Sequence, residues 1–234
     1  MKKLANQLVA VLFIVTLLTG SIGMSSVHAT GDLSENELEN SVHNIINTIE
    51  KNVVISEEGV FIKNKGQIIK NLRQEDIENF KILSKNQGIK YDKPINKNTV
   101  LEMFGEGIEL SDKAIKSGEL TVLKNGSFIE TEDDDFYLQG GSTYDKSYWW
   151  GKERYKSTYN AGRWTRDLRS AGHLNAGMAV IAGAIFGGVG AIPNGLSSIY
   201  VYNLADKVDY RNSLNNRGII AKLTYTLVFT TASQ

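Results

Sequence analysis

Residues 176–192 read AGMAVIAGAIFGGVGAI, a run of seventeen residues without one polar side chain. Small residues recur at every fourth position of this run, which would give one face of a helix a smooth stripe. Pro193-Asn194-Gly195 then favours a turn. A second, amphipathic helix is predicted beyond it from Leu196, Ile199, Tyr200, Asn203, Leu204 and Lys207. Together these segments predict a helical hairpin.

The apolar run has two interpretations. It carries no charge, and a charged residue costs about 2.5–3.5 kcal/mol at the centre of a bilayer, so it is able to enter a membrane. It is also shorter than the roughly 20 residues of a span, and its five glycines each weaken an isolated helix by about 0.8–1 kcal/mol relative to alanine. We expect a core helix at rest that can also insert. The candidate insertion residues are Ala179, Gly183, Phe186, Gly187 and Ala191.

The end of the chain predicts one β-strand. Apolar residues occupy the odd positions from Ile219 to Phe229, and Lys222, Thr224, Thr226 and Thr230 occupy even ones. Alternation with period two over eleven residues is typical of a half-buried strand. We expect this strand to pack against the hairpin.

Upstream of the apolar run, residues 144–169 mix aromatic and cationic side chains, including all three tryptophans of the chain. We predict a basic aromatic helix here. Tryptophan and tyrosine favour the membrane interface, and lysine and arginine favour anionic headgroups. The same mixture can stack on carbohydrate polymers, or its aromatics can be core residues. The candidate interface and anion-binding residues are Trp149, Trp150, Lys152, Arg154, Arg163, Trp164, Arg166 and Arg169.

Residues 30–141 predict an α-rich domain with short hairpins. Ser34 followed by Glu37 fits a capping box, and apolar residues at helical spacing follow from Leu38 to Ile49. Hairpins are expected at 53–62 and at 121–129, and a helix is expected to end at Gly88. A short helix is expected over 100–104. The run of five carboxylates in 130–135 is expected to be a solvated loop.

The charge distribution divides the chain near Gly141. Residues 30–141 hold 13 Lys and Arg against 21 Asp and Glu, whereas residues 142–234 hold 11 against 5. A basic module and an acidic module that restrains it would show this split, although two domains can also differ in charge by drift. The predicted fold class is α+β, with an acidic α-rich domain over 30–141 and a basic, aromatic and Gly-rich domain over 142–234.

Residues 1–29 predict a cleavable secretory signal peptide. Lys2 and Lys3 precede the apolar run 8–18, and Val27-His28-Ala29 places small side chains at a cleavage site. The apolar run is too short to span a bilayer. We therefore expect secretion after cleavage near Ala29. The absence of cysteine means that the exported chain is stabilised by packing alone or by folding upon a partner.

The sequence predicts no enzyme of a familiar class, no cofactor and no metal site. His43 and His173 are far apart, neither has a neighbouring ligand at metal spacing, and no nucleophile or phosphate-binding motif is present. Carboxylate-based hydrolases stay open, because pairs of acids are visible only in three dimensions. Nucleic acid is not an expected partner of an exported protein.

The residues YWWGK at 148–152, AGAIFGGVGAIPNG at 182–195 and the cationic charge around them give the C-terminal part a compositional resemblance to Gram-positive bacteriocins and related exported toxins. Gly140-Gly141 is similar to the double-glycine end of a bacteriocin leader. The chain is longer than such proteins, lacks their cysteines, and already has a secretory signal. The resemblance implies permeabilisation of the membranes of competing bacteria, and it assigns no functional residue.

These observations favour a secreted, membrane-active antimicrobial protein whose apolar hairpin inserts into or associates with target membranes. The alternative is a non-toxic secreted protein that binds the cell envelope or has a structural role. The expected partner is a bacterial membrane or envelope, with self-association possible through the small-residue stripe.

Overall fold

The first element is the helix α2 (Glu35–Glu50), which the apolar spacing of 38–49 predicted. Leu38, Val42, Ile45, Ile46 and Ile49 are all buried on one face. The predicted hairpin follows as β1 (Val53–Ser56) and β2 (Gly59–Ile62), paired antiparallel. The computed structural model describes residues 34–130, 136–137, 141–173, 178–186 and 196–234, so the predicted signal peptide and the acidic run 131–135 lie outside the described residues.

Three further helices complete the N-terminal half: α3 (Lys65–Asn71), α4 (Gln74–Asn86) and α5 (Lys97–Ser117). Helix α4 confirms the prediction of a helix before Gly88. The short helix expected over 100–104 is wrong in length, because α5 runs for 21 residues through Gly105 and Gly107. It begins with an Asn96 capping box and ends at Gly118 in the left-handed conformation, which satisfies backbone groups at both ends.

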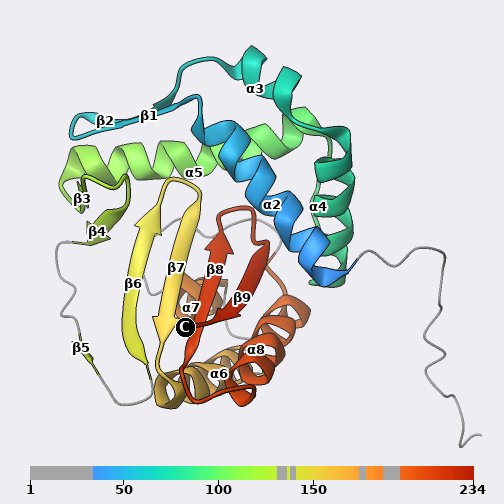
Figure 1. Cartoon of the computed structure of the whole chain (residues 1–234), viewed down its shortest axis with the longest axis vertical. Helices are drawn as coiled ribbons and strands as arrows, with labels where there is room; N and C mark the ends of the chain where they lie inside the picture. Colours follow the sequence, from blue (N-terminus) through green and yellow to red (C-terminus); the bar gives the residue numbers. More distant parts are fainter. Residues whose placement is uncertain (1–33, 131–135, 138–140, 174–177, 187–195) are drawn as a thin grey trace, which may run out of the picture. The chain divides into compact units, whose positions relative to one another are not determined.

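The main sheet is antiparallel and has the strand order β3-β4-β6-β7-β8-β9, with the short β5 (Phe136–Tyr137) paired to β6. The strands are β3 (Leu120–Val122), β4 (Phe128–Glu130), β6 (Ser142–Tyr148), β7 (Gly151–Lys156), β8 (Ile219–Thr224) and β9 (Phe229–Ser233). The pairing of β3 with β4 confirms the hairpin predicted at 121–129. Figure 1 shows β6 to β9 side by side, with α7 (Met178–Phe186) behind them. In this view α6 (Thr158–His173) and α8 (Ser198–Ser213) lie at the lower end of the sheet.

The predicted C-terminal architecture, a helical hairpin with one terminal strand, is wrong. Residues 142–234 contribute four strands to the sheet and three helices among their described parts. The expected basic aromatic helix is split: residues 144–156 form most of β6 and β7, and only α6 is helical. The single strand expected from Ile219 is the hairpin β8–β9. Among the described residues no helix combines the length and apolar character that a membrane crossing requires.

Helix α5 covers the tips of the β6–β7 and β8–β9 hairpins of the sheet. Trp149 and Trp150 form the turn between β6 and β7 and are nevertheless buried, because the ring of Trp149 packs on Phe104 of α5 at 5.9 Å. A side chain at Gly107 would collide with the ring of Tyr225, in the β8–β9 turn, and would lie 3.1 Å from the carbonyl oxygen of Trp149. Gly107 therefore permits the close approach of helix and sheet.

The β8–β9 hairpin is also anchored by residues that follow α4. The side-chain amide of Gln87 donates to the carbonyl of Phe229 at 2.6 Å and accepts from its N–H at 3.0 Å, as a neighbouring strand would. The hydroxyl of Tyr91 donates to the carbonyl of Thr226 at 2.5 Å. These bonds join the acidic and basic halves of the sequence, and Glu35–Gln234 form one compact unit. The division into domains 30–141 and 142–234 stays a prediction.

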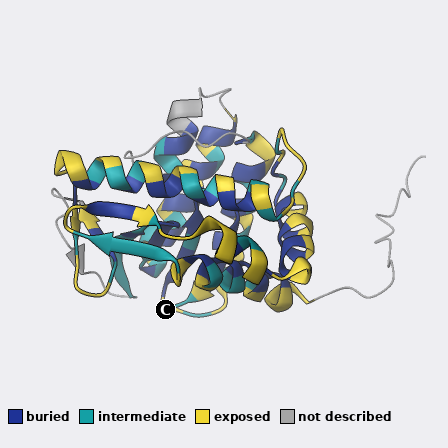
Figure 2. Cartoon of the chain, turned by 90° about the horizontal axis from the view of Figure 1, so that it is seen from above, coloured by how far each residue is buried: buried dark blue, intermediate teal, exposed yellow. Residues whose placement is uncertain are grey.

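Burial follows the helix faces that the sequence pattern predicts. Figure 2 shows buried residues on the inner sides of the helices and exposed residues on their outer sides. The core contains Val42, Ile45 and Ile49 of α2, Phe80 of α4 and Phe104 of α5. In the C-terminal half it contains Leu168, Ile185, Tyr200, Leu204 and Leu223. Packing without disulfides thus stabilises both halves.

At Leu227 a glycine substitution is expected to destabilise the protein less than an alanine substitution does. It lies in the β8–β9 turn with φ +69°, is fully buried, and donates its N–H to the carbonyl of Thr224. A left-handed conformation costs a residue with a Cβ about 1–2 kcal/mol, which glycine avoids. Leu227→Ala loses about 2–5 kcal/mol of burial and keeps that cost. Leu227→Gly should therefore be about 1 kcal/mol less destabilising than Leu227→Ala in urea unfolding. A glycine variant less stable than the alanine variant would contradict this account of the turn.

Candidate functional site

The strand β7 carries charged side chains into the interior of the protein. Its residues Lys152, Glu153 and Arg154 are at most 9% exposed, although β7 reads GKERYK. Strand geometry sends Lys152 and Arg154 to the face covered by α6, α7 and α8, and Glu153 to the opposite face. A buried charge needs partners, because leaving water is costly for it. The partners of Arg154 and Glu153 define two polar clusters.

Arg154 holds the C-terminal end of the apolar helix α7. Its Nη1 donates to the carbonyl oxygens of Ala184 at 3.1 Å and Ile185 at 2.7 Å. The indole Nε1 of Trp164, from α6, donates to the same Ala184 carbonyl at 2.7 Å. The guanidinium also lies over the Trp164 ring, 4.8 Å from its centroid. We name Arg154 and Trp164, with the two carbonyls that they bind, the α7 latch.

Asp145 on β6 neutralises the latch. Its Oδ2 lies 3.1 Å from Nε of Arg154, an ion pair whose N–H is not aligned as a hydrogen bond. Its Oδ1 accepts from Nζ of Lys156 at 2.9 Å. Burial alone would raise the pKa of Asp145, but the charges of Arg154 and Lys156 outweigh it, and the pKa lies below its ordinary range. The carboxylate is therefore charged at neutral pH and keeps Arg154 in place.

The latch binds carbonyls in the last described turn of α7. A carbonyl oxygen has two lone pairs and can accept from a side chain, and cationic side chains near a helix C-terminus interact favourably with its dipole. Elsewhere α7 presents apolar side chains to the core, with Ile185 and Phe186 buried. The Phe186 ring lies 6.3 Å from the ring of Tyr225, centroid to centroid. Arg154 and Trp164 thus provide directional polar contacts to α7.

The opposite face of the sheet carries a tyrosine cluster, defined by Tyr144, Tyr148, Glu153 and Tyr155. The rings of Tyr144 and Tyr155 stack at 4.2 Å across β6 and β7. The hydroxyls of Tyr148 and Tyr155 donate to Oε2 of Glu153 at 3.1 and 3.0 Å. Glu153 also pairs with Lys222 of β8 at 3.2 Å. These half-buried aromatic faces could stack on sugar rings, in the way that the sequence suggested for this region.

His43 of α2 lies within electrostatic range of this cluster. Burial lowers its pKa below the ordinary value of 6.5, and the Lys222 ammonium lowers it further, against the opposing effect of the Glu153 carboxylate. His43 is therefore a neutral group at physiological pH. Neither His43 nor any other histidine or acid of the described residues belongs to a group of three or more such side chains that could hold a metal ion.

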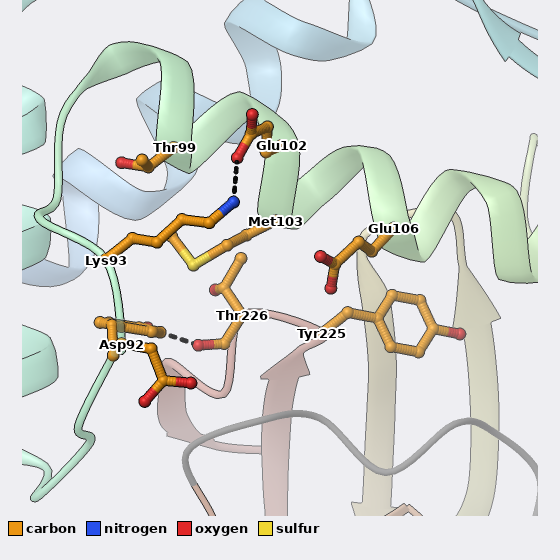
Figure 3. Close-up of a pocket in the computed structure, with 9 residues that line it drawn as sticks. Asp92, Lys93, Thr99, Glu102, Met103, Glu106, Tyr225 and Thr226 are labelled. Atoms are coloured by element: carbon orange, nitrogen blue, oxygen red, sulfur yellow. Dashed lines mark hydrogen bonds and ion pairs between the residues drawn. The ribbon is translucent and has the colours of Figure 1, made fainter.

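A pocket of about 120 Å³ lies between α5 and the β8–β9 turn. Figure 3 shows Thr99, Glu102, Met103 and Glu106 entering it from α5, and Tyr225 and Thr226 entering it from the turn. Lys93 pairs with Glu102 across its rim at 3.0 Å. Because Asp92, Glu102 and Glu106 outnumber Lys93, the rim is negative and better suited to a small cationic group than to an anion.

The candidate interface residues are not brought together on one surface. Trp149, Trp150, Lys152, Arg154 and Trp164 are buried, Arg163 and Arg166 are exposed on α6, and Arg169 pairs with Asp206 and Asp209 of α8. Of the insertion candidates, Phe186 is buried and Gly183 is half-buried in α7. Ala179 lies within α7, and Gly187 and Ala191 lie outside the described residues. Arg154 and Trp164 do converge, on the end of α7.

The sequence does not predict Asp145, Glu153 or the tyrosines of the cluster as site residues. Tyr144, Lys146 and Tyr148 occur at every second position, as do Glu153 and Tyr155, and this alternation is the signal that could have placed them on one face of two strands. Comparison of the chain with family models, curated proteins and solved structures finds no match. The geometry of the chain itself therefore carries the functional argument.

The low pKa of His43 predicts a loss of stability in acid. As the pH falls below 6.5, the unfolded chain takes up a proton that the folded chain resists, so the free energy of unfolding decreases until the folded histidine is also protonated. His43→Gln should remove this part of the decrease, measured by urea unfolding between pH 7.5 and 5. The exposed His173 supplies the control His173→Gln. Identical pH profiles for wild type and His43→Gln would contradict the assignment.

Proposed function

We propose that the chain is a secreted, membrane-active, bacteriocin-like protein that stores its apolar segment docked on the sheet and releases it at a target membrane. The observation that carries this proposal is the α7 latch. Arg154 and Trp164 bind the carbonyls of Ala184 and Ile185. In an α-helix, a carbonyl accepts from the N–H four residues later. A helix that continued through 192 would use these same carbonyls for the N–H groups of Gly188 and Val189.

Leaving the sheet would therefore require the carbonyls of Ala184 and Ile185 to lose the donors that Arg154 and Trp164 provide. The described part of α7 has nine residues and a length of about 14 Å, and a helix over 176–192 would reach about 25 Å. That length approaches the roughly 30 Å of hydrocarbon in a bilayer, which such a helix could nearly cross where the bilayer thins around it. Inside lipid every backbone group must be bonded within the protein, which favours the longer helix there. Release from Arg154 and Trp164 would thus accompany insertion.

Leakage of anionic liposomes tests this proposal. Trp164→Phe removes the indole donor to Ala184, and a hydrogen bond contributes about 1 kcal/mol, so the released form should become roughly fivefold more populated. Trp149→Phe is the matched control, because Trp149 is equally buried and its Nε1 has no hydrogen-bond partner. We expect dye release to be about fivefold faster for Trp164→Phe than for the wild type.

The control should release dye at the wild-type rate. If neither the wild type nor Trp164→Phe permeabilises anionic vesicles, while both stay folded by circular dichroism, the membrane-active function is refuted. Equal acceleration by Trp149→Phe and Trp164→Phe would instead attribute leakage to general destabilisation, and the latch would lose its proposed role.

A second candidate function is binding of the cell envelope, and the tyrosine cluster favours it. The rings of Tyr144 and Tyr155 stack beneath the ammonium group of Lys146, and Glu153 accepts from the hydroxyls of Tyr148 and Tyr155. Half-buried aromatic rings fixed in this way are of the kind that stacks on sugar rings. Tyr155→Ala would remove one ring of the Tyr144–Tyr155 stack without touching the latch. Loss of binding to purified cell walls in this variant, with no leakage by the wild type, would favour the envelope-binding function over the membrane-active one.

A further inference from the structure

One face of α6 is exposed along its length. Tyr159, Arg163, Arg166 and Ser170 follow each other at intervals of four, three and four residues, which places them in one row on a helix. All four are exposed, and Tyr159 is 63% exposed, the largest value among the exposed large hydrophobic side chains. We name Tyr159, Arg163 and Arg166 the α6 stripe. The opposite face of α6 is buried through Ala161, Trp164 and Leu168.

The two arginines of the α6 stripe have no ion-pair partner within the described part of the chain. Arg169, one turn further on, is different, since it pairs with Asp206 at 2.9 Å and Asp209 at 3.4 Å from α8. Asp167 is exposed on the adjoining face and forms no ion pair with either stripe arginine. A guanidinium without a carboxylate partner keeps its donors available, and its planar fork matches phosphate oxygens.

Apolar side chains accompany these charges at one end of the helix pair α6–α8. The side-chain amide of Asn212 donates to the carbonyl of Thr158 at 3.1 Å, which joins the last turn of α8 to the start of α6. Tyr210 and Leu214 flank Asn212 in sequence and are 57% and 52% exposed. Tyr159 shares the row of the two arginines, and Tyr210 and Leu214 are exposed on the helix that packs against α6. Exposed apolar side chains together with arginine are the composition of surfaces that lie at the bilayer interface.

We propose that the α6 stripe binds the phosphates of anionic lipid headgroups and brings the protein to the bilayer surface before α7 leaves the sheet. This inference rests on the proposed membrane-active function. It commits to a lipid surface, because a soluble phosphate would use the arginines alone and would leave Tyr159, Tyr210 and Leu214 without a role. Helix α6 also contributes Trp164 to the latch, so headgroup binding occurs on the element that holds α7.

The test is co-sedimentation of the full chain with vesicles of phosphatidylglycerol and phosphatidylcholine, compared with vesicles of phosphatidylcholine alone. Each basic residue near an anionic surface strengthens binding roughly fivefold. The double variant R163Q/R166Q should therefore bind the anionic vesicles about 25-fold more weakly than the wild type. R169Q/D206N is the control and should bind within about twofold of the wild type, because it removes one cation and the carboxylate paired with it and leaves the net charge unchanged. D167N should strengthen binding, since it removes the exposed carboxylate beside the stripe.

The outcomes separate this inference from the proposed function. Wild-type binding by R163Q/R166Q, equal binding of the wild type to neutral vesicles, or an equal loss in R169Q/D206N would each overturn the α6 stripe. If binding needs Arg163 and Arg166 but neither the wild type nor Trp164→Phe releases dye, the stripe stands and the insertion of α7 fails. If dye is released and R163Q/R166Q releases it equally well, the proposed function stands and the stripe fails. Competition by 10 mM inorganic phosphate that abolishes binding would reassign the arginines to a soluble anion and overturn the lipid assignment.

Discussion

The buried guanidinium of Arg154 constrains the C-terminal half of this protein more than any other group. It lies on β7, a strand with neighbours on both sides, and faces the layer of helices. Moving such a charge out of water is unfavourable unless a counter-charge and hydrogen-bond acceptors surround it. Asp145 is the counter-charge from the adjacent strand, and the end of α7 provides the acceptors. The carbonyls of Ala184 and Ile185 must therefore lie at the guanidinium, and the strand register must place residue 145 beside residue 154.

This arrangement gives an apolar helix a polar attachment. Apolar contacts alone would hold α7 on the sheet without fixing its position along the sheet, because hydrophobic burial is not directional. Hydrogen bonds to the carbonyls of Ala184 and Ile185 fix that position, and Trp164 repeats the contact from α6. A buried ion pair is weak evidence for stability, since well-packed apolar residues often stabilise a core equally well. The buried charge of Arg154 therefore specifies one position of α7 on the sheet.

The elements with strong periodicity could be predicted from the sequence, and the sheet could not. Helices α2 and α4 and the two short hairpins of the N-terminal half follow from apolar spacing and turn residues. The sequence does not predict the β6–β7 hairpin, because its turn is Trp149-Trp150, which carries no turn chemistry, and because β7 buries three charged residues. The pattern of 219–229 predicts one strand instead of the β8–β9 hairpin, because Leu227 occupies a left-handed position that usually takes glycine or asparagine. In both cases tertiary contacts with α5, made possible by Gly107, override local preference.

The same contacts explain why net charge was a coarse guide to the functional surface. The C-terminal half carries six more basic than acidic residues, yet its cations have different surroundings. Arg154 and Lys156 share the carboxylate of Asp145, Lys222 pairs with Glu153, and Arg169 pairs across to α8. A partner outside the protein meets the potential of the exposed charges, because a buried ion pair contributes little field at the surface. Sequence counting weights all these cations equally, whereas folding leaves Arg163 and Arg166 exposed and without an ion pair to any described residue, on the helix that also holds α7. The separation of structural from available charge is therefore a product of the strand register and of the α6–α8 packing, and it becomes visible only once both are known.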